Sequence, residues 1–127
     1  MASTTSDLWP GDIGESELRT PLAILKEQAT LLGAKTGQLV TAEVESRAED
    51  EWFFHRFYLV APALEYKYKL FTVRHPISLY PMFTYSGGGP WSAPIDSEAG
   101  FLDWLRKALT SEETRRIVRA LIAQSKT

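Results

Sequence analysis

The stretch from Trp52 to Tyr85 constrains the fold of this chain more than any other part of the sequence. It holds eleven of the fifteen aromatic residues among 127. Aliphatic and β-branched residues lie between the rings, and Ala61-Pro62-Ala63 and Arg74-His75-Pro76 interrupt them. Aromatic and β-branched runs separated by proline-marked turns are typical of consecutive antiparallel strands. The stretch therefore predicts the greater part of a sheet.

Four strands are expected between Leu39 and Tyr85. A first strand near residues 40–45 alternates small apolar residues with carboxylates, which is the period of a half-buried strand. A second, Trp52–Ala61, is apolar on both faces, as in a strand that is central or covered on its second side. A third covers residues 66–74. The fourth, residues 77–85, contains Pro81, which cannot donate to a strand ladder and indicates an edge strand or a bulge.

Strict alternation divides the side chains of the third strand between two faces. Tyr66, Tyr68 and Leu70 are expected on one face. The other face is expected to carry Phe71 and Val73 together with two lysines.

A helix is predicted over residues 21–32, before the sheet. Thr20 supplies an N-cap hydroxyl, and Pro21 occupies the first helical position, where its missing N–H is not needed. Leu22, Leu25, Ala29 and Leu32 follow at helical spacing. Gly33 is then expected to end the helix in a left-handed conformation.

Two helices, at residues 98–109 and 111–125, are predicted to close the chain. Asp96 or Ser97 can cap the first, and Thr110 with Glu113 forms a capping box for the second. Helix, four strands, helix and helix in this order predict a single α+β domain with an antiparallel meander and helices mainly on one face. Residues 1–15 are expected to form a loosely ordered arm, and residues 16–127 the domain.

Composition narrows the class of protein. The chain has no cysteine, which excludes a disulfide framework, a thiolate zinc site and a cysteine nucleophile. The net charge is −2, and no dense basic stripe indicates nucleic-acid binding. The sequence has no long apolar run, so no membrane association is expected, and a cytoplasmic location is the expectation. No cofactor or metal is predicted.

The two histidines and the triple glycine resemble parts of a metal site and of a phosphate-binding loop, but neither fits the complete motif. His55 and His75 are the only histidines; His55 alternates with phenylalanines and is expected to be a hydrogen-bonded core residue. His75 precedes a proline in a predicted turn and is expected to face solvent or to form a hydrogen bond within the turn.

Gly87, Gly88 and Gly89 are followed by Pro90-Trp91, with no lysine and no immediate helix, so we expect a loop rather than a phosphate-binding site. Serine catalysis is not expected, because no base is evident beside a hydroxyl.

Glu65 and Lys67 lie two residues apart on the third predicted strand, and Asp50 lies upstream. This pattern resembles the Asp…Glu-x-Lys signature of the restriction-endonuclease-like nucleases. The resemblance implies a Mg²⁺ site that cleaves phosphodiesters. The alternative, which we favour, is that Glu65, Lys67 and Lys69 form the solvated side of a strand, since charges that alternate along a strand usually face solvent.

The surplus of aromatic residues decides the functional hypothesis. One face of a small sheet cannot accommodate all these rings, and aromatic residues beyond the needs of a core often anchor protein interfaces. We therefore expect a non-enzymatic interaction module, as a homodimer or as an accessory or immunity-type partner of another protein. Its surface is predicted to include Trp52, Phe54, Tyr58, Tyr80 and Trp91, with Gly87–Gly89 at its rim. A small-molecule binding module with an aromatic-lined pocket is the alternative, and a divergent nuclease is the second alternative.

Overall fold

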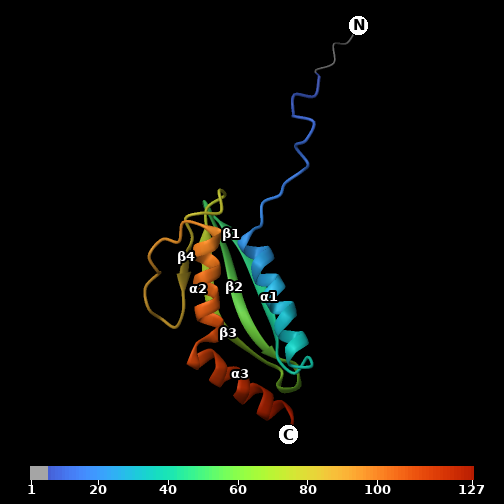
Figure 1. The fold of residues 1–127 in the computed structure, drawn as a ribbon, viewed down its shortest axis with the longest axis vertical. Coiled ribbons are helices and arrows are strands. Elements are labelled where there is room, and N and C mark those ends of the chain that lie inside the picture. The colour runs from blue at the N-terminus through green and yellow to red at the C-terminus, as the bar shows by residue number, and fades with distance from the viewer. Residues whose placement is uncertain (1–5) are drawn as a thin grey trace.

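The computed structural model describes residues 6–127 and confirms the predicted α+β architecture. A meander of strands is preceded by one helix and followed by two (Figure 1). The elements are α1 (Pro21–Lys35), β1 (Thr41–Glu49), β2 (Trp52–Ala61), the 3₁₀ turn η1 (Pro62–Leu64), β3 (Tyr66–His75), β4 (Phe83–Tyr85), α2 (Glu98–Thr110) and α3 (Glu112–Ser125). The bounds of β2 match the prediction residue for residue.

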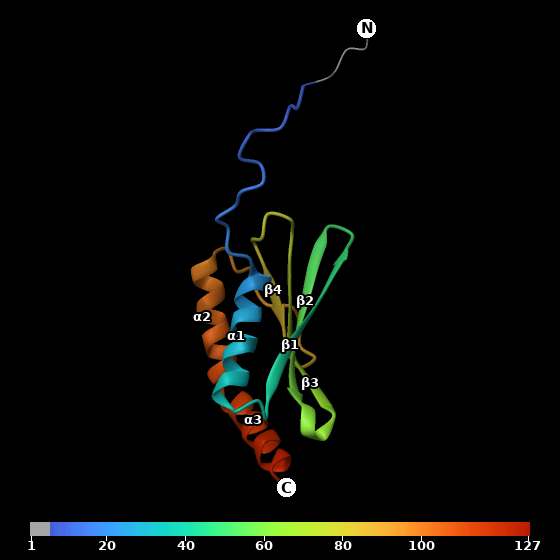
Figure 2. The same ribbon diagram turned by 90° about the vertical axis from the view of Figure 1, so that its right-hand side faces the viewer.

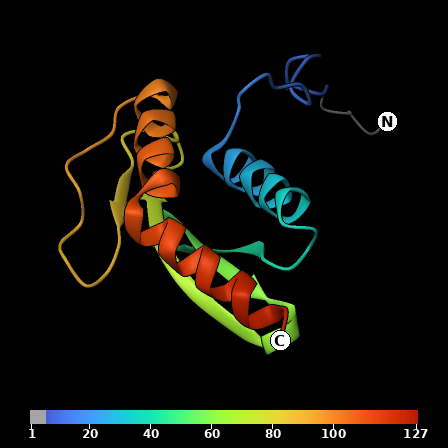
Figure 3. The same ribbon diagram turned by 60° about the horizontal axis from the view of Figure 1, so that its bottom comes forward.

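The sheet has the order β1-β2-β3-β4, and every neighbouring pair is antiparallel. Within the described residues no helix crosses between two strands, as the sequence predicted. Figure 2 shows all three helices on one side of the sheet, so the other side is open. Figure 3 shows α2 and α3 meeting at an angle, with α3 lying along the end of the β2–β3 hairpin.

The hydrophobic core lies between the sheet and the helices. Phe57 and Phe71 stack face to face at its centre, with ring centroids 5.0 Å apart and planes at 2°. The ring of Trp104 meets Phe71 edge-on at 5.0 Å. The helices contribute the buried residues Ile24, Leu25, Phe101, Leu105 and Leu121. The core therefore draws on all three helices and on both central strands.

A bulge in β3 corrects the predicted faces of that strand. Phe57 pairs with Phe71, but the next residue, Tyr58, pairs with Lys69, so Leu70 is the extra residue. An inserted residue reverses the alternation on either side of it. Phe71 and Val73 therefore share the helix-covered face with Tyr68, and the predicted separation of these side chains is wrong.

Other predicted boundaries also differ from the structure, and β1 continues past residue 45 to Glu49. Helix α1 continues through Gly33 to Lys35, and the left-handed conformation occurs at Gly37 and Gln38 instead. Helix α3 is capped by Ser111, whose hydroxyl accepts from the N–H of Thr114, rather than by Thr110. The fourth strand begins only at Phe83, after Pro81, which has no N–H to donate.

The N-terminal arm leaves the domain at Thr20. Residues 6–19 contain turns but no helix or strand, and they extend away from the domain (Figures 1 and 2). The predicted loosely ordered arm covers residues 1–15, of which 1–5 lie outside the described part of the chain.

Candidate functional site on the open face of the sheet

The open face of the sheet carries the side chains that alternate with the buried ones. Phe57 and Leu59 of β2 are buried under the helices, so their neighbours on the strand face the opposite way. The strand register brings the following residues onto this open face: Glu43, Glu45, Arg47, Glu49, Trp52, Phe54, Arg56, Tyr58, Lys67, Lys69, Arg74, Phe83 and Tyr85. It is therefore both aromatic and charged.

Arg74 lies at the centre of the aromatic part of this face. Its guanidinium carbon is 4.3 Å from the ring centroid of Trp91, 4.5 Å from that of Trp52 and 5.3 Å from that of Phe83. A planar guanidinium stacks well on aromatic faces, and such contacts contribute about 0.5–2 kcal/mol each. We call Arg74 with Trp52, Phe54, Phe83, Tyr85 and Trp91 the Arg74 cluster.

Pairing between distant parts of the chain assembles the cluster. Arg74 lies opposite Phe54 on one side and opposite Phe83 on the other. Trp91 comes from the loop over residues 86–95 and lies 5.5 Å from Tyr85 and 6.4 Å from Phe54, between ring centroids. The loop is held to the sheet edge by a bond from the Ser92 N–H to the Thr84 carbonyl and by the Met82–Ile95 bridge. The chain thus partly covers the second face of β2 itself.

The guanidinium of Arg74 has no acidic partner among residues 6–127. Its Nε is buried without a hydrogen bond, and no ion pair in this part of the chain includes it. A buried donor without an acceptor is energetically unfavourable. The rings hold the guanidinium in place, and its terminal N–H groups, which no acidic side chain among residues 6–127 occupies, can meet a carboxylate from another molecule.

The other charges of the open face leave an excess of bases. Lys67 Nζ lies 2.9 Å from a Glu43 oxygen and 3.0 Å from a Glu45 oxygen. Hydrogen bonds to Glu43 and Glu45, in that order, raise the pKa of Lys67. Arg47 pairs with Glu49 at 2.6 Å. No ion pair is found for Arg56, Lys69 or Arg74 among the described residues, so this face carries an excess of positive charge although the whole chain is acidic.

The structure brings together three of the five residues predicted for the interaction surface. Trp52, Phe54 and Trp91 belong to the Arg74 cluster. Tyr58 lies on the same face, and Lys67 Nζ lies 4.7 Å from the centroid of its ring. Tyr80 instead packs against the hydrophobic core, and burial, together with the charge of Glu98, raises the pKa of its hydroxyl. All five side chains are half-buried.

The predicted rim residues belong to the loop that carries Trp91. Gly87, Gly88 and Gly89 precede Trp91 in the loop that closes the cluster. Gly87 and Gly88 have φ angles of 70° and 89°, a backbone conformation that residues other than glycine rarely adopt. These two glycines let the chain turn back so that Trp91 reaches the sheet.

The three residues of the nuclease-like pattern do not converge. Asp50 lies in the turn between β1 and β2, and Glu65 follows η1 at the far end of β2. A strand of this length separates them by about 30 Å. Lys67 pairs with glutamates of β1 instead. Among residues 6–127, no three histidine or acidic side chains gather into a group that could hold a metal.

A chain of hydrogen bonds through two buried histidines was missed by sequence reasoning. The hydroxyl of Ser46 lies 2.7 Å from His55 Nδ1, and the Nε2 atoms of His55 and His75 lie 2.9 Å apart. His75 Nδ1 lies 2.8 Å from the carbonyl oxygen of Pro76. Both histidines are 5% exposed. The core role predicted for His55 is confirmed, and His75 bonds its turn rather than facing solvent.

The carbonyl of Pro76 determines the tautomer of each ring. Since a carbonyl only accepts, His75 Nδ1 donates and His75 Nε2 accepts. His55 Nε2 must then donate, and His55 Nδ1 accepts from the Ser46 hydroxyl. Burial, and secondarily the charge of His75, lowers the pKa of His55 to about 4. A base this weak activates a serine poorly at neutral pH, so the arrangement favours a structural role.

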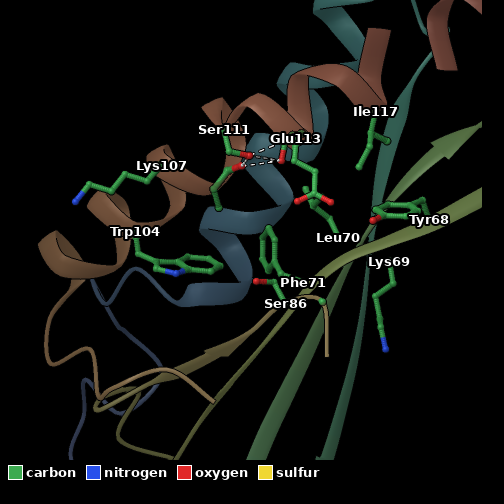
Figure 4. Close-up of a pocket in the computed structure, with 13 residues that line it drawn as sticks. Tyr68, Lys69, Leu70, Phe71, Ser86, Trp104, Lys107, Ser111, Glu113 and Ile117 are labelled. Carbon is green, nitrogen blue, oxygen red and sulfur yellow. Dashed lines mark hydrogen bonds between the residues drawn. The ribbon is translucent and has the colours of Figure 1, made fainter. Parts of the chain in front are cut away.

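A cavity of about 390 Å³ lies where α2 meets α3, beside β3 (Figure 4). The rings of Tyr68, Phe71 and Trp104 line it, and the carboxylate of Glu113 points into it. The ammonium groups of Lys69 and Lys107 point away from the cavity in the same view. Its volume lies within the range of small-ligand sites.

Comparisons with protein families, with curated proteins and with solved structures find no significant match for this chain. No helix within residues 6–127 has the length and the apolar character needed to cross a membrane.

Proposed function

We propose that this chain is a non-enzymatic protein-interaction module whose open sheet face binds an acidic, partly apolar segment of a protein partner. The observation that carries the proposal is the guanidinium of Arg74, stacked among rings and without a carboxylate partner in the described chain. Arginine and tryptophan are the residues most enriched at the energetic centres of protein interfaces. The cluster combines both.

Charge and preorganisation support the same function. Arg56 and Lys69 add unpaired positive charge beside the cluster, and complementary charges raise the rate and the specificity of association. Because Trp52 and Trp91 already contact the guanidinium and hold it in place, little side-chain entropy is lost when a carboxylate binds. The partner segment should supply a carboxylate for Arg74 and an apolar side chain for the surrounding rings.

Peptide selection provides the test of this function. From a random display library, the chain should select peptides enriched in Asp or Glu next to aromatic or aliphatic residues. Arg74→Gln should weaken the selected peptide about tenfold or more, since loss of a central arginine typically removes over 1.4 kcal/mol of binding free energy. Fluorescence polarisation measures this. Arg115→Gln, on the exposed side of α3, is the matched control and should leave binding unchanged.

Two results would contradict the proposal. One is selection of peptides without acidic enrichment. The other is equal binding of the selected peptide to the wild type and to the Arg74→Gln variant, while circular dichroism shows that the variant is folded.

The cavity beside α3 supports a second candidate function, binding of a small cationic ligand. Aromatic walls with one inward-pointing carboxylate suit an ammonium group, which gains both cation–π and ionic contacts. Glu113 makes no ion pair among the described residues, so its charge is available to a ligand. The ligand class would be an aryl or alkyl amine.

An aryl ammonium probe tests this second function. Benzyltrimethylammonium should change the tryptophan fluorescence of the wild type, and Trp104→Phe should remove that change. Glu113→Gln is expected to weaken binding about fivefold to tenfold, as for loss of one partly solvated charge contact. Glu112→Gln is the control, since Glu112 lies next in sequence but outside the cavity lining. Equal affinity of the neutral probe benzyl alcohol would contradict this function.

A further inference from the structure

The N-terminal arm exposes an unusual number of large apolar side chains. Leu8 is 85% exposed, Trp9 71%, Ile13 61% and Leu18 75%. Single exposed apolar residues are common, but four within eleven residues of one segment indicate a surface that another molecule covers. The arm is therefore the main apolar segment of the described chain that the domain itself leaves uncovered.

The arm is acidic as well as apolar. Asp7, Asp12, Glu15 and Glu17 lie between or beside its apolar residues, and residues 6–18 contain no base. Arg19, at its end, pairs with Glu27 of α1 at 2.9 Å. Acidic residues next to exposed apolar ones are the chemistry that the open sheet face is expected to bind.

Local hydrogen bonds give part of the arm a defined shape. The N–H of Trp9 donates to the Asp7 carboxylate at 3.0 Å. The N–H of Ile13 donates to the Pro10 carbonyl at 3.1 Å, and that of Glu15 to the Asp12 carbonyl at 2.9 Å. A turn that is already formed loses less entropy when it docks. Trp9 and Ile13 are thus presented on a short turn.

The direction of the arm favours a second copy of the chain as its receptor. The arm leaves the domain at the start of α1, on the helix-covered side of the sheet, and extends past the end of the domain (Figure 2). The open sheet face of the same chain lies on the other side of the sheet from the helices. In a two-fold dimer, by contrast, each arm can reach the partner's open face, and one contact is made twice.

Resting on the proposed function, we infer that two copies of this chain form a dimer by exchanging arms. The arm of each copy binds the open sheet face of the other. Trp9 and Leu8 pack against the rings of the Arg74 cluster, and acidic residues of the arm pair with Arg74, Arg56 and Lys69. The site on the open face is then incomplete without the second copy.

Sedimentation of the full chain and of two variants tests this inference. The full chain should sediment as a dimer at micromolar concentrations. An arm variant, Leu8→Ser with Trp9→Ser, and a face variant, Arg74→Gln, should each raise the dimer dissociation constant about tenfold or more. Leu31→Ser, which removes an exposed leucine of α1, is the matched control and should dimerise as the wild type does.

Mixing the two variants gives the decisive result. The face variant has an intact arm and the arm variant has an intact face, so together they restore one of the two contacts. A heterodimer should form at concentrations at which each variant alone is monomeric. A dimer that persists in both variants, or a mixture that does not associate, would overturn the arm exchange.

The outcome separates this inference from the proposed function. A monomeric full chain that still binds the selected acidic peptides through Arg74 overturns the exchange alone. A monomer whose arm variant binds those peptides more tightly also overturns it, because the arm then covers the open face of its own chain. Loss of Arg74-dependent peptide binding in all forms overturns the proposed function instead.

Discussion

Replacing Phe57 with alanine is expected to lower the free energy of unfolding by about 3–5 kcal/mol, the usual range for a fully buried phenylalanine. The side chain is 1% exposed and stacks on Phe71 at the centre of the core. Its removal leaves a cavity between the sheet and the helices. The helices cannot move in to fill this cavity, because they are also packed against the rest of the sheet. Urea denaturation followed by circular dichroism measures the loss.

Phe53→Ala is the matched control for that substitution. Phe53 belongs to the same strand and the same face, but it is 36% exposed. It stacks on His75, with ring centroids 5.6 Å apart. The expected loss is about 1–2 kcal/mol, because less apolar surface is removed from contact. Equal losses at the two positions would mean that the core is not centred on Phe57.

The course of the strands was predictable because their residues are locally consistent. Most residues of β2 are aromatic or β-branched and favour a strand, and Pro62 marks its end, so its bounds follow from composition. The bounds of β4 did not follow, because residues 77–82 have strand-like composition but turn at Pro76–Leu79. Local preference identifies a strand only where no turn interrupts it.

The bulge at Leu70 explains most of what sequence reasoning missed. An unbroken register from the Ala61–Tyr66 pair would place His75 opposite Trp52 and on the open face. The bulge shifts His75 to a position opposite Phe53, on the same face as His55. One inserted residue leaves hydrophobic composition unchanged, so the sequence gives no signal of it. The His55–His75 contact could not be found without it.

The sequence predicted several aromatic residues of the open face but not Arg74, which lies at the centre of their cluster. The aromatic surplus indicated Trp52, Phe54 and Trp91. Arg74, by contrast, looks like an ordinary charge at a strand end. Its place in the cluster depends on pairing with both β2 and β4 and on the return of a loop, and these are long-range contacts. A pattern along one strand cannot show a site built from four segments.

The stability of the fold is expected to fall as the pH decreases from about 6.5 to about 4, by about 2–3 kcal/mol from His55 alone. The usual pKa of a histidine is 6.5, and burial, with the neighbouring His75, lowers that of His55 to about 4. Between these values the unfolded chain binds a proton that the folded chain does not. The contribution is therefore fully present above pH 6.5 and lost as the pH falls toward 4.

Protonation of His55 is unfavourable even though it breaks none of the hydrogen bonds to Ser46, His75 or Pro76. A proton added at His55 Nδ1 requires only that the Ser46 hydroxyl turn from donor to acceptor. The other two bonds, to His75 and to Pro76, keep their directions. What opposes protonation is thus the burial of a charge, with no carboxylate among residues 6–127 bonded to either ring. Stability should decline gradually, with the strands still paired.

Two histidine variants distinguish burial from the neighbouring ring as the cause. Denaturation midpoints at pH 7.5, 5 and 4 should show the decline in the wild type. His55→Gln should remove it, whatever its effect on stability at pH 7.5. His75→Gln should retain most of it, because burial is the larger cause of the shift. If the decline persisted unchanged in His55→Gln, exposed carboxylates would be responsible, and folding would leave the pKa of His55 near its usual value.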